Sequence, residues 1–147
     1  MTAPSPPPTA PAGDAAVALD VVFVQFDRRK YEGALERLLS LLDRLPVRSR
    51  VVVVDNAHPG DPARAVTARL VHLGGDNSSW EFSGFDRGLA YLDSLPEPAP
   101  VVALATDAFR AYGEHFLSLV TPAALAAARD LRAAVGWVDA WPTETTL

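Results

Sequence analysis

The chain has 147 residues, a formal net charge of −5 and no cysteine, and 49% of its residues are apolar. This length suits one domain with a hydrophobic core, and the acidic balance argues against a nucleic-acid partner, which requires clustered Lys and Arg. The lack of cysteine excludes a disulfide framework, a zinc-thiolate site and a thiol nucleophile, and it fits a reducing compartment.

Residues 1–17 are predicted to form a disordered tail, because five prolines fall within the first eleven positions. The tail has neither the basic nor the apolar region of a signal peptide. No apolar run in the sequence approaches the roughly 20 residues that span a bilayer. We therefore expect a cytoplasmic protein, with one α/β domain over residues 18–147.

The first part of the domain alternates between strand and helix patterns. Residues 18–26 are β-branched and aromatic, which predicts a strand. Apolar residues then recur at helical spacing from Tyr31 to Leu45, and Pro46 ends that helix. Four consecutive valines at 51–54 are typical of a strand covered on both faces.

The middle of the chain continues this alternation. Residues 56–61 contain Pro and Gly and predict a loop, 62–69 a short helix, and 70–73 a strand. Ser78, followed three residues later by Glu81, fits a capping box at the start of the next helix. The aromatic side chains of that helix are expected to pack in the core; they are Trp80, Phe82 and Phe85.

The last elements complete the pattern. Residues 100–105 predict a strand, Thr121 and Pro122 fit an N-cap and the first helical position, and Gly136 fits the end of that helix. The alternation of strands and helices predicts a doubly wound, mostly parallel sheet with helices on both faces, of the Rossmann-like class.

Polar side chains follow several of the predicted strands. Open α/β sheets bind ligands beyond the carboxyl ends of their strands, so these residues predict a small-molecule site, and a nucleotide is the leading ligand. The candidate binding residues are Asp55, Asn56, Asp76, Asn77, Asp86 and Asp107.

Structural roles compete with binding for several of these residues. Asp55 fits an Asx-turn as well as a nucleotide contact. Gly74 and Gly75 would either let the backbone approach a diphosphate or supply positive φ in a turn. Arg28 and Arg29 follow the first strand, where they would meet a phosphate or remain solvated.

Other side chains indicate no further chemistry. His58, His72 and His115 lack the spacing of metal ligands, and His72 is expected to be structural. Ser83 does not lie in a GxSxG elbow, so no hydrolase nucleophile is indicated.

Three segments together resemble the nucleotide-binding half of family-2 glycosyltransferases, which have the GT-A fold. They are VVVVDN at residues 51–56, the stretch from Gly74 to Leu89, and TDAF at residues 106–109. The stretch WEFSGFDRGL at residues 80–89 is similar to a subgroup of bacterial surface-polysaccharide transferases. The resemblance covers roughly residues 18–140.

This resemblance implies roles for two acids. Asp55 would contact the base or ribose of a nucleotide-sugar donor. Asp107 would belong to the DxD site that holds a divalent metal, Mg²⁺ or Mn²⁺, and the donor diphosphate. Positions 105 and 109 are Ala and Phe, so Asp107 is the one acid here that matches this motif. The family also implies a carbohydrate acceptor, inverting sugar transfer in polysaccharide biosynthesis, and a position in the cytoplasm or peripheral to the inner membrane face.

The family's catalytic base normally lies in a C-terminal half, whereas this sequence ends about forty residues after Asp107. Asp139 is a remote candidate for the base. The sequence therefore leaves three hypotheses open: a glycosyltransferase-like enzyme domain, a catalytically silent nucleotide-binding or assembly module that needs a partner chain, and a doubly wound domain of unrelated function.

Overall fold

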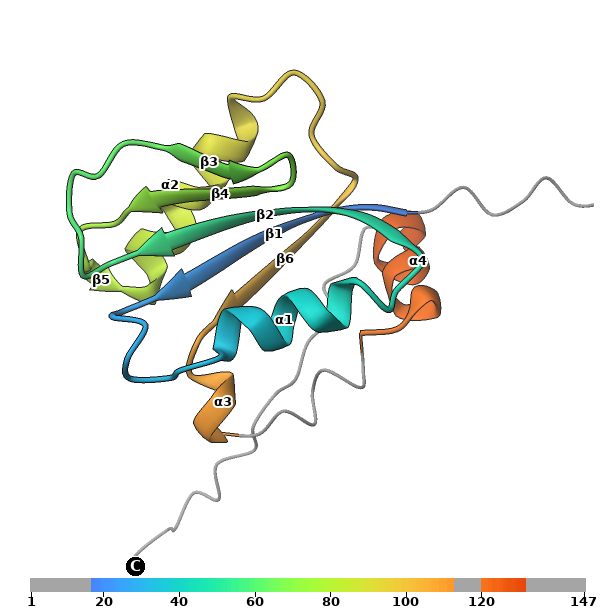
Figure 1. The fold of residues 1–147 in the computed structure, drawn as a ribbon. Coiled ribbons are helices and arrows are strands. Elements are labelled where there is room, and N and C mark those ends of the chain that lie inside the picture. The colour runs from blue at the N-terminus through green and yellow to red at the C-terminus, as the bar shows by residue number, and fades with distance from the viewer. Residues whose placement is uncertain (1–16, 113–119, 132–147) are drawn as a thin grey trace, which may run out of the picture.

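The computed structural model describes residues 17–112 and 120–131, which form a layered α/β structure (Figure 1). The elements are, in chain order, β1 (Val17–Gln25), α1 (Ala34–Leu42), β2 (Val47–Asp55), β3 (Arg64–Thr67), β4 (Leu70–Gly74), β5 (Ser78–Trp80), α2 (Glu81–Asp93), β6 (Val101–Thr106), α3 (Phe109–Tyr112) and α4 (Pro122–Leu131). The predicted tail and the predicted helix end at Gly136 lie outside the described residues, except for Val17, which begins β1.

The sheet has five strands in the order β3-β4-β2-β1-β6. β1 pairs in parallel with β2 and with β6, and β2 pairs in parallel with β4. β3 alone runs antiparallel, beside β4. The prediction of an α/β fold with a mostly parallel sheet is therefore confirmed, and the arrangement is consistent with a Rossmann-like fold.

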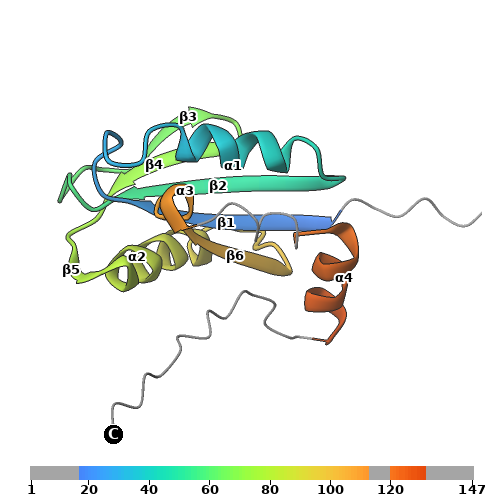
Figure 2. The same ribbon diagram turned by 90° about the horizontal axis from the view of Figure 1, so that it is seen from below.

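Helices cover both faces of the sheet, as predicted (Figure 2). On one face α1 packs with side chains of β1 and β2, and Phe109 of α3 and Leu125 of α4 join this core. On the other face α2 packs on a second core through Leu92. The strands that are central to the sheet are apolar on both sides, because each side meets a helix.

The segment predicted as a helix over 62–69 is instead a β-hairpin arm, and that prediction is wrong. β3 pairs with β4 from Arg64↔His72 to Thr67↔Leu70. All four of its residues are exposed. A helix here would have had no apolar face to bury, whereas a strand protects the otherwise open edge of β4.

The capping box predicted at Ser78 does not form. Ser78 belongs to β5, and α2 begins at Glu81 without a side-chain cap on its first amides. The Ser83 hydroxyl instead donates to the Trp80 carbonyl at 3.0 Å and accepts from the Ser79 amide at 3.3 Å. The cap predicted at Thr121 is confirmed, since its hydroxyl accepts from the Ala124 amide at 3.1 Å.

Two glycines bring α2 unusually close to the sheet. A Cβ at Gly88 would lie 2.3 Å from a methyl of Val22, and one at Gly84 would lie 2.6 Å from a methyl of Val24. Such contacts are too short for any side chain, so glycine lets the helix backbone lie directly on β1. This close packing fixes the start of α2 beside the carboxyl end of β1.

An ion pair between the buried Asp20 carboxylate and the partly exposed Arg50 joins β1, β2 and the loop that leads into β6. Asp20 is only 1% exposed, and its two oxygens each accept from Arg50 at 2.7 Å. The same carboxylate accepts from the Ala99 amide at 3.0 Å, and Arg50 also donates to the Glu97 carbonyl. Burial of Asp20 is therefore compensated at each oxygen.

Within residues 17–112 and 120–131, none of the helices combines the length and the hydropathy of a membrane-spanning segment.

We expect the substitution Asp20→Ala to lower the free energy of unfolding by about 2 kcal/mol, because it removes the charged hydrogen bonds from Arg50 and leaves the Ala99 amide without its acceptor. Urea denaturation measures this change. The matched control is Asp43→Ala, which breaks the exposed Asp43–Arg69 pair and should change the free energy by less than about 1 kcal/mol. Equal effects of the two substitutions would contradict a structural role for the Asp20 pair.

Candidate ligand-binding site

A cavity of about 360 Å³ lies beyond the carboxyl ends of β1 and β6. The connection from β1 to β2 passes through α1 on one face of the sheet. The connection from β4 to β6 passes through α2 on the other face and leads to the opposite side of β1. The space between β1 and β6 is therefore a topological switch point, where open α/β sheets bind ligands. The residues that line the cavity are Val24, Gln25, Phe26, Lys30, Tyr31, Asn56, Asn77, Trp80, Glu81, Thr106, Asp107 and Ala108.

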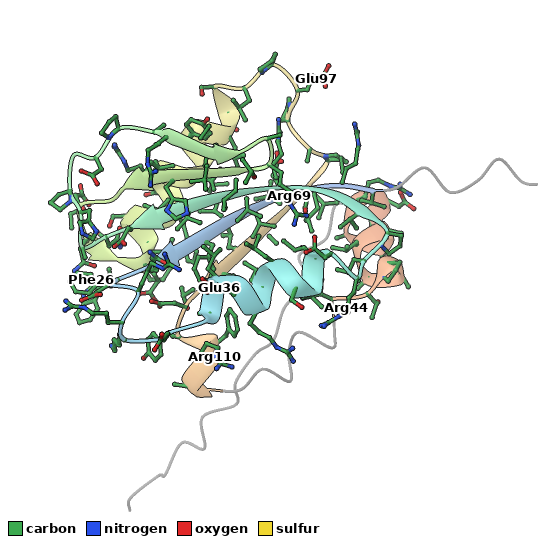
Figure 3. The ribbon with its side chains drawn as sticks, viewed as in Figure 1. Phe26, Glu36, Arg44, Arg69, Glu97 and Arg110 are labelled. Atoms are coloured by element: carbon green, nitrogen blue, oxygen red, sulfur yellow. The ribbon has the colours of Figure 1, made fainter. Side chains whose placement is uncertain are left out.

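Phe26 lies at the edge of the sheet where β1 ends, far from Glu97 in the loop before β6 (Figure 3). It directly follows Gln25, which is buried and donates from Nε2 to Asp55 at 2.8 Å. Asp55 also accepts from the Ala57 amide and lies 3.2 Å from Nδ1 of His58. These contacts hold the ends of β1 and β2 together at the cavity.

Asp107 is the most buried carboxylate of the cavity, with 8% of its surface exposed. One of its oxygens accepts from the Phe26 amide at 3.3 Å, which links the ends of β6 and β1. Burial raises the pKa of Asp107, while this amide and the positive charge of Lys30 partly oppose the rise. The negative charge of Asp55 adds slightly to it.

Asn56 holds in place the wall of the cavity that contains Asn77 and Trp80. Its Nδ2 donates to the Trp80 carbonyl at 2.8 Å and lies 3.5 Å from Oδ1 of Asn77. A Cβ at Gly75 would lie 1.9 Å from Oδ1 of Asn56, so only glycine leaves room for this side chain. One buried amide thereby fixes the segment that carries Asn77 and Trp80.

The prediction that Gly74 and Gly75 supply positive φ in a turn is wrong, and neither of them lines the cavity. Neither has positive φ, and a Cβ at Gly74 would lie 2.0 Å from the His58 carbonyl oxygen. They allow the chain to pack closely against the loop after β2 and the side chain of Asn56.

Two non-glycine residues with positive φ line the cavity, Asn77 at 54° and Trp80 at 56°, and a third, Asp27 at 58°, directly follows the lining residue Phe26. Asp and Asn adopt this region with little strain, but Trp does not. Trp80 also has ψ of −135°, outside the left-handed helical region. Backbone strain of this kind clusters at ligand-binding sites, where the surrounding contacts maintain it.

The strained backbone of Trp80 presents its side chain to solvent at the cavity. Trp80 is 76% exposed, and Phe82 is also mostly exposed. The expectation that both pack in the core is therefore wrong for these two, whereas Phe85 does pack against the core of the α2 face. Since the side chain gains little burial, the aromatic ring is free to stack on a planar ligand.

The arginines after β1 are occupied by neighbouring carboxylates. Arg28 pairs with Glu36 at 2.6 Å, and Arg29 pairs with Asp27 at 2.6 Å. The hydrogen bonds from Arg29 lower the pKa of Asp27 to about 2. Neither arginine lines the cavity; Lys30 does.

The six candidate binding residues fall into three groups. Asn56, Asn77 and Asp107 line the cavity. Asp55 does not line the cavity but accepts a hydrogen bond from Gln25, which does. The other two, Asp76 and Asp86, are exposed and do not line the cavity. Asp76 accepts from the Ser78 amide at 2.9 Å, and this hydrogen bond lowers its pKa.

The wall formed by the β1–α1 connection was missed by the sequence reasoning. It contributes Gln25, Phe26, Lys30 and Tyr31. The sequence did contain a signal, because Gln25 and Phe26 follow a buried strand just as Asp55 and Asp107 do. At this strand end the sequence analysis considered only Arg28 and Arg29, and neither lines the cavity.

The carboxylates of the cavity form an incomplete metal site. Only Asp107 and Glu81 line it, and the described ranges contain no group of three or more His, Asp or Glu side chains placed to hold a metal ion. Mg²⁺ is commonly bound by one or two carboxylates together with ligand phosphates. The side chains thus fit Mg²⁺ or Mn²⁺ only when the ligand itself supplies oxygens, and a metal on Asp107 stays a prediction.

No model of a known protein family, no curated protein and no solved structure matches this chain.

The raised pKa of Asp107 predicts a specific pH dependence of stability. Because the folded protein holds this proton more tightly than the unfolded chain does, stability should fall as the pH rises from the ordinary value of 3.8 through the folded pKa. The substitution Asp107→Asn keeps an acceptor for the Phe26 amide and removes the charge. We expect this variant to unfold at higher temperature than the parent at pH 7, and to lose that advantage near pH 3.

Thermal unfolding between pH 3 and pH 7 measures this difference. Asp93→Asn, at the exposed end of α2 and away from the cavity, is the control for the same change of charge. If Asp107→Asn were less stable than the parent at pH 7, the ionised carboxylate would stabilise the fold, and this result would contradict the prediction.

Proposed function

We propose that this chain binds the nucleoside-diphosphate part of a nucleotide sugar, as a glycosyltransferase-like domain, in the cavity between β1 and β6. The observation that carries the proposal is the position of this cavity at the switch point of a mostly parallel sheet. Its volume lies in the lower part of the range of small-molecule sites.

The lining has the chemistry that such a ligand requires. Phe26 and Trp80 are exposed aromatic side chains that offer flat faces to a base or a sugar ring. Asn77 and Thr106 add an amide and a hydroxyl that hydrogen-bond to ribose or sugar hydroxyl groups. Lys30 adds a positive charge beside them.

The reaction proposed is inverting sugar transfer. An acceptor hydroxyl would attack the anomeric carbon, the bond from that carbon to the diphosphate oxygen would break, and the nucleoside diphosphate would leave with the electron pair. The hydroxyl proton needs a general base within hydrogen-bond reach. Asp139 lies outside the described residues, and we assign no residue to this role; a carbohydrate is the proposed acceptor.

A silent assembly module is the second candidate, and one observation favours it. Val102 and Leu104 of β6 are 44% and 51% exposed. β6 is the last strand of the described sheet, so its apolar side chains and its open edge are available for a partner chain. Such a module would bind the nucleotide without transferring a sugar.

Calorimetric titration with UDP, GDP and dTDP tests the proposed function. We expect one of the three to bind, and the substitution Trp80→Ala to weaken that binding by about tenfold through loss of stacking. Phe82→Ala is the matched control, because Phe82 is a neighbouring exposed aromatic residue that does not line the cavity.

Failure of all three nucleotides to bind to the folded protein would overturn the proposal. Equal weakening by Trp80→Ala and Phe82→Ala would place any binding elsewhere. Binding without sugar transfer from the matching nucleotide sugar would favour the silent module.

A further inference from the structure

The chain contains a single lysine, Lys30, and it lines the cavity. Three cations follow one another after β1, and two of them are held by carboxylates: Arg28 by Glu36, and Arg29 by Asp27. Within residues 17–112 and 120–131, no carboxylate lies within ion-pair distance of Lys30. The lysine is exposed, and its ammonium lies 5.1 Å from the centre of the Tyr31 ring.

We infer that Lys30 binds the diphosphate of the ligand and that this binding requires no divalent metal. The inference rests on the proposed function, since it assigns the charge that the same cavity would present to its ligand. An ammonium is a compact charge with three donors, which suits a phosphate group. The carboxylates of the cavity do not form a metal site by themselves, whereas Lys30 is a cation that the protein itself supplies.

The surroundings of Lys30 hold its backbone in place and leave the charge of its side chain unneutralised. Its backbone amide donates to the Asp27 carbonyl at 3.0 Å, which closes the turn after β1. The face of Tyr31 attracts the ammonium without removing its charge. The positive charge of Lys30 also interacts with Asp107. The lysine therefore offsets the repulsion between this buried carboxylate and an anionic ligand.

Titration with inorganic pyrophosphate in the presence of a chelator tests this inference directly. We expect pyrophosphate to bind without metal, and Lys30→Met to weaken it by about tenfold, the effect of removing one charged hydrogen bond. Met keeps an aliphatic chain beside Tyr31, so the fold should be unaffected. Lys30→Arg should retain most of the binding, and binding to the parent should weaken as salt increases.

Arg29→Met is the matched control, because it removes the same charge from the same turn but from outside the cavity. Lysine acylation gives an independent readout. With one lysine in the chain, pyrophosphate should slow modification of Lys30 and leave modification of the N-terminal amine unchanged.

Two results would overturn the inference: pyrophosphate binding that appears only with Mg²⁺ or Mn²⁺, and equal binding by the parent and Lys30→Met. The outcomes are distinct from those for the proposed function. A nucleotide that binds equally well to Lys30→Met would refute the role of Lys30 alone. Pyrophosphate binding that depends on Lys30, without binding of UDP, GDP or dTDP, would refute the proposed function alone.

Discussion

The parallel pairing of β1 with both β2 and β6 is the constraint on which the rest of the structure depends. Parallel strands end at the same edge of a sheet, so Gln25, Asp55 and Thr106 are brought side by side although they are far apart in the sequence. The helices on the two faces diverge from this edge, since α1 and α2 lie on opposite sides. The cavity follows from this arrangement.

A few polar contacts then give the cavity its shape. Asn56 bonds to the segment that carries Trp80, and Asp107 bonds to the amide that follows β1. Both side chains are buried, so each draws two distant segments together in an environment where hydrogen bonds are strong. The strained backbone at Trp80 and the buried charge of Asp107 both reduce stability. Both features lie at the same cavity. Packing does not require either of them, whereas strained backbone and perturbed pKa values are typical of binding sites.

The sequence predicted the parallel strands because runs such as 51–54 are apolar throughout, a pattern that needs cover on both faces. It also placed Asp107 correctly at a strand end. It did not predict β3, since pairing with the edge of β4 is a tertiary contact that outweighs local helical preference. It misjudged Trp80 for a related reason: helical spacing suggested burial, but the helix begins only at Glu81, after Trp80, and the strained backbone turns the ring outward.

Binding of a nucleoside diphosphate where β1 and β6 end can be located by amide chemical shifts recorded during titration with UDP, GDP and dTDP, because each backbone position reports separately. We expect the shifts to concentrate at Phe26, Asn77 and Asp107, and Arg48 and Val101 at the opposite ends of their strands to stay unchanged. Shifts centred on those opposite strand ends, or no shifts with any of the three nucleotides, would contradict this expectation.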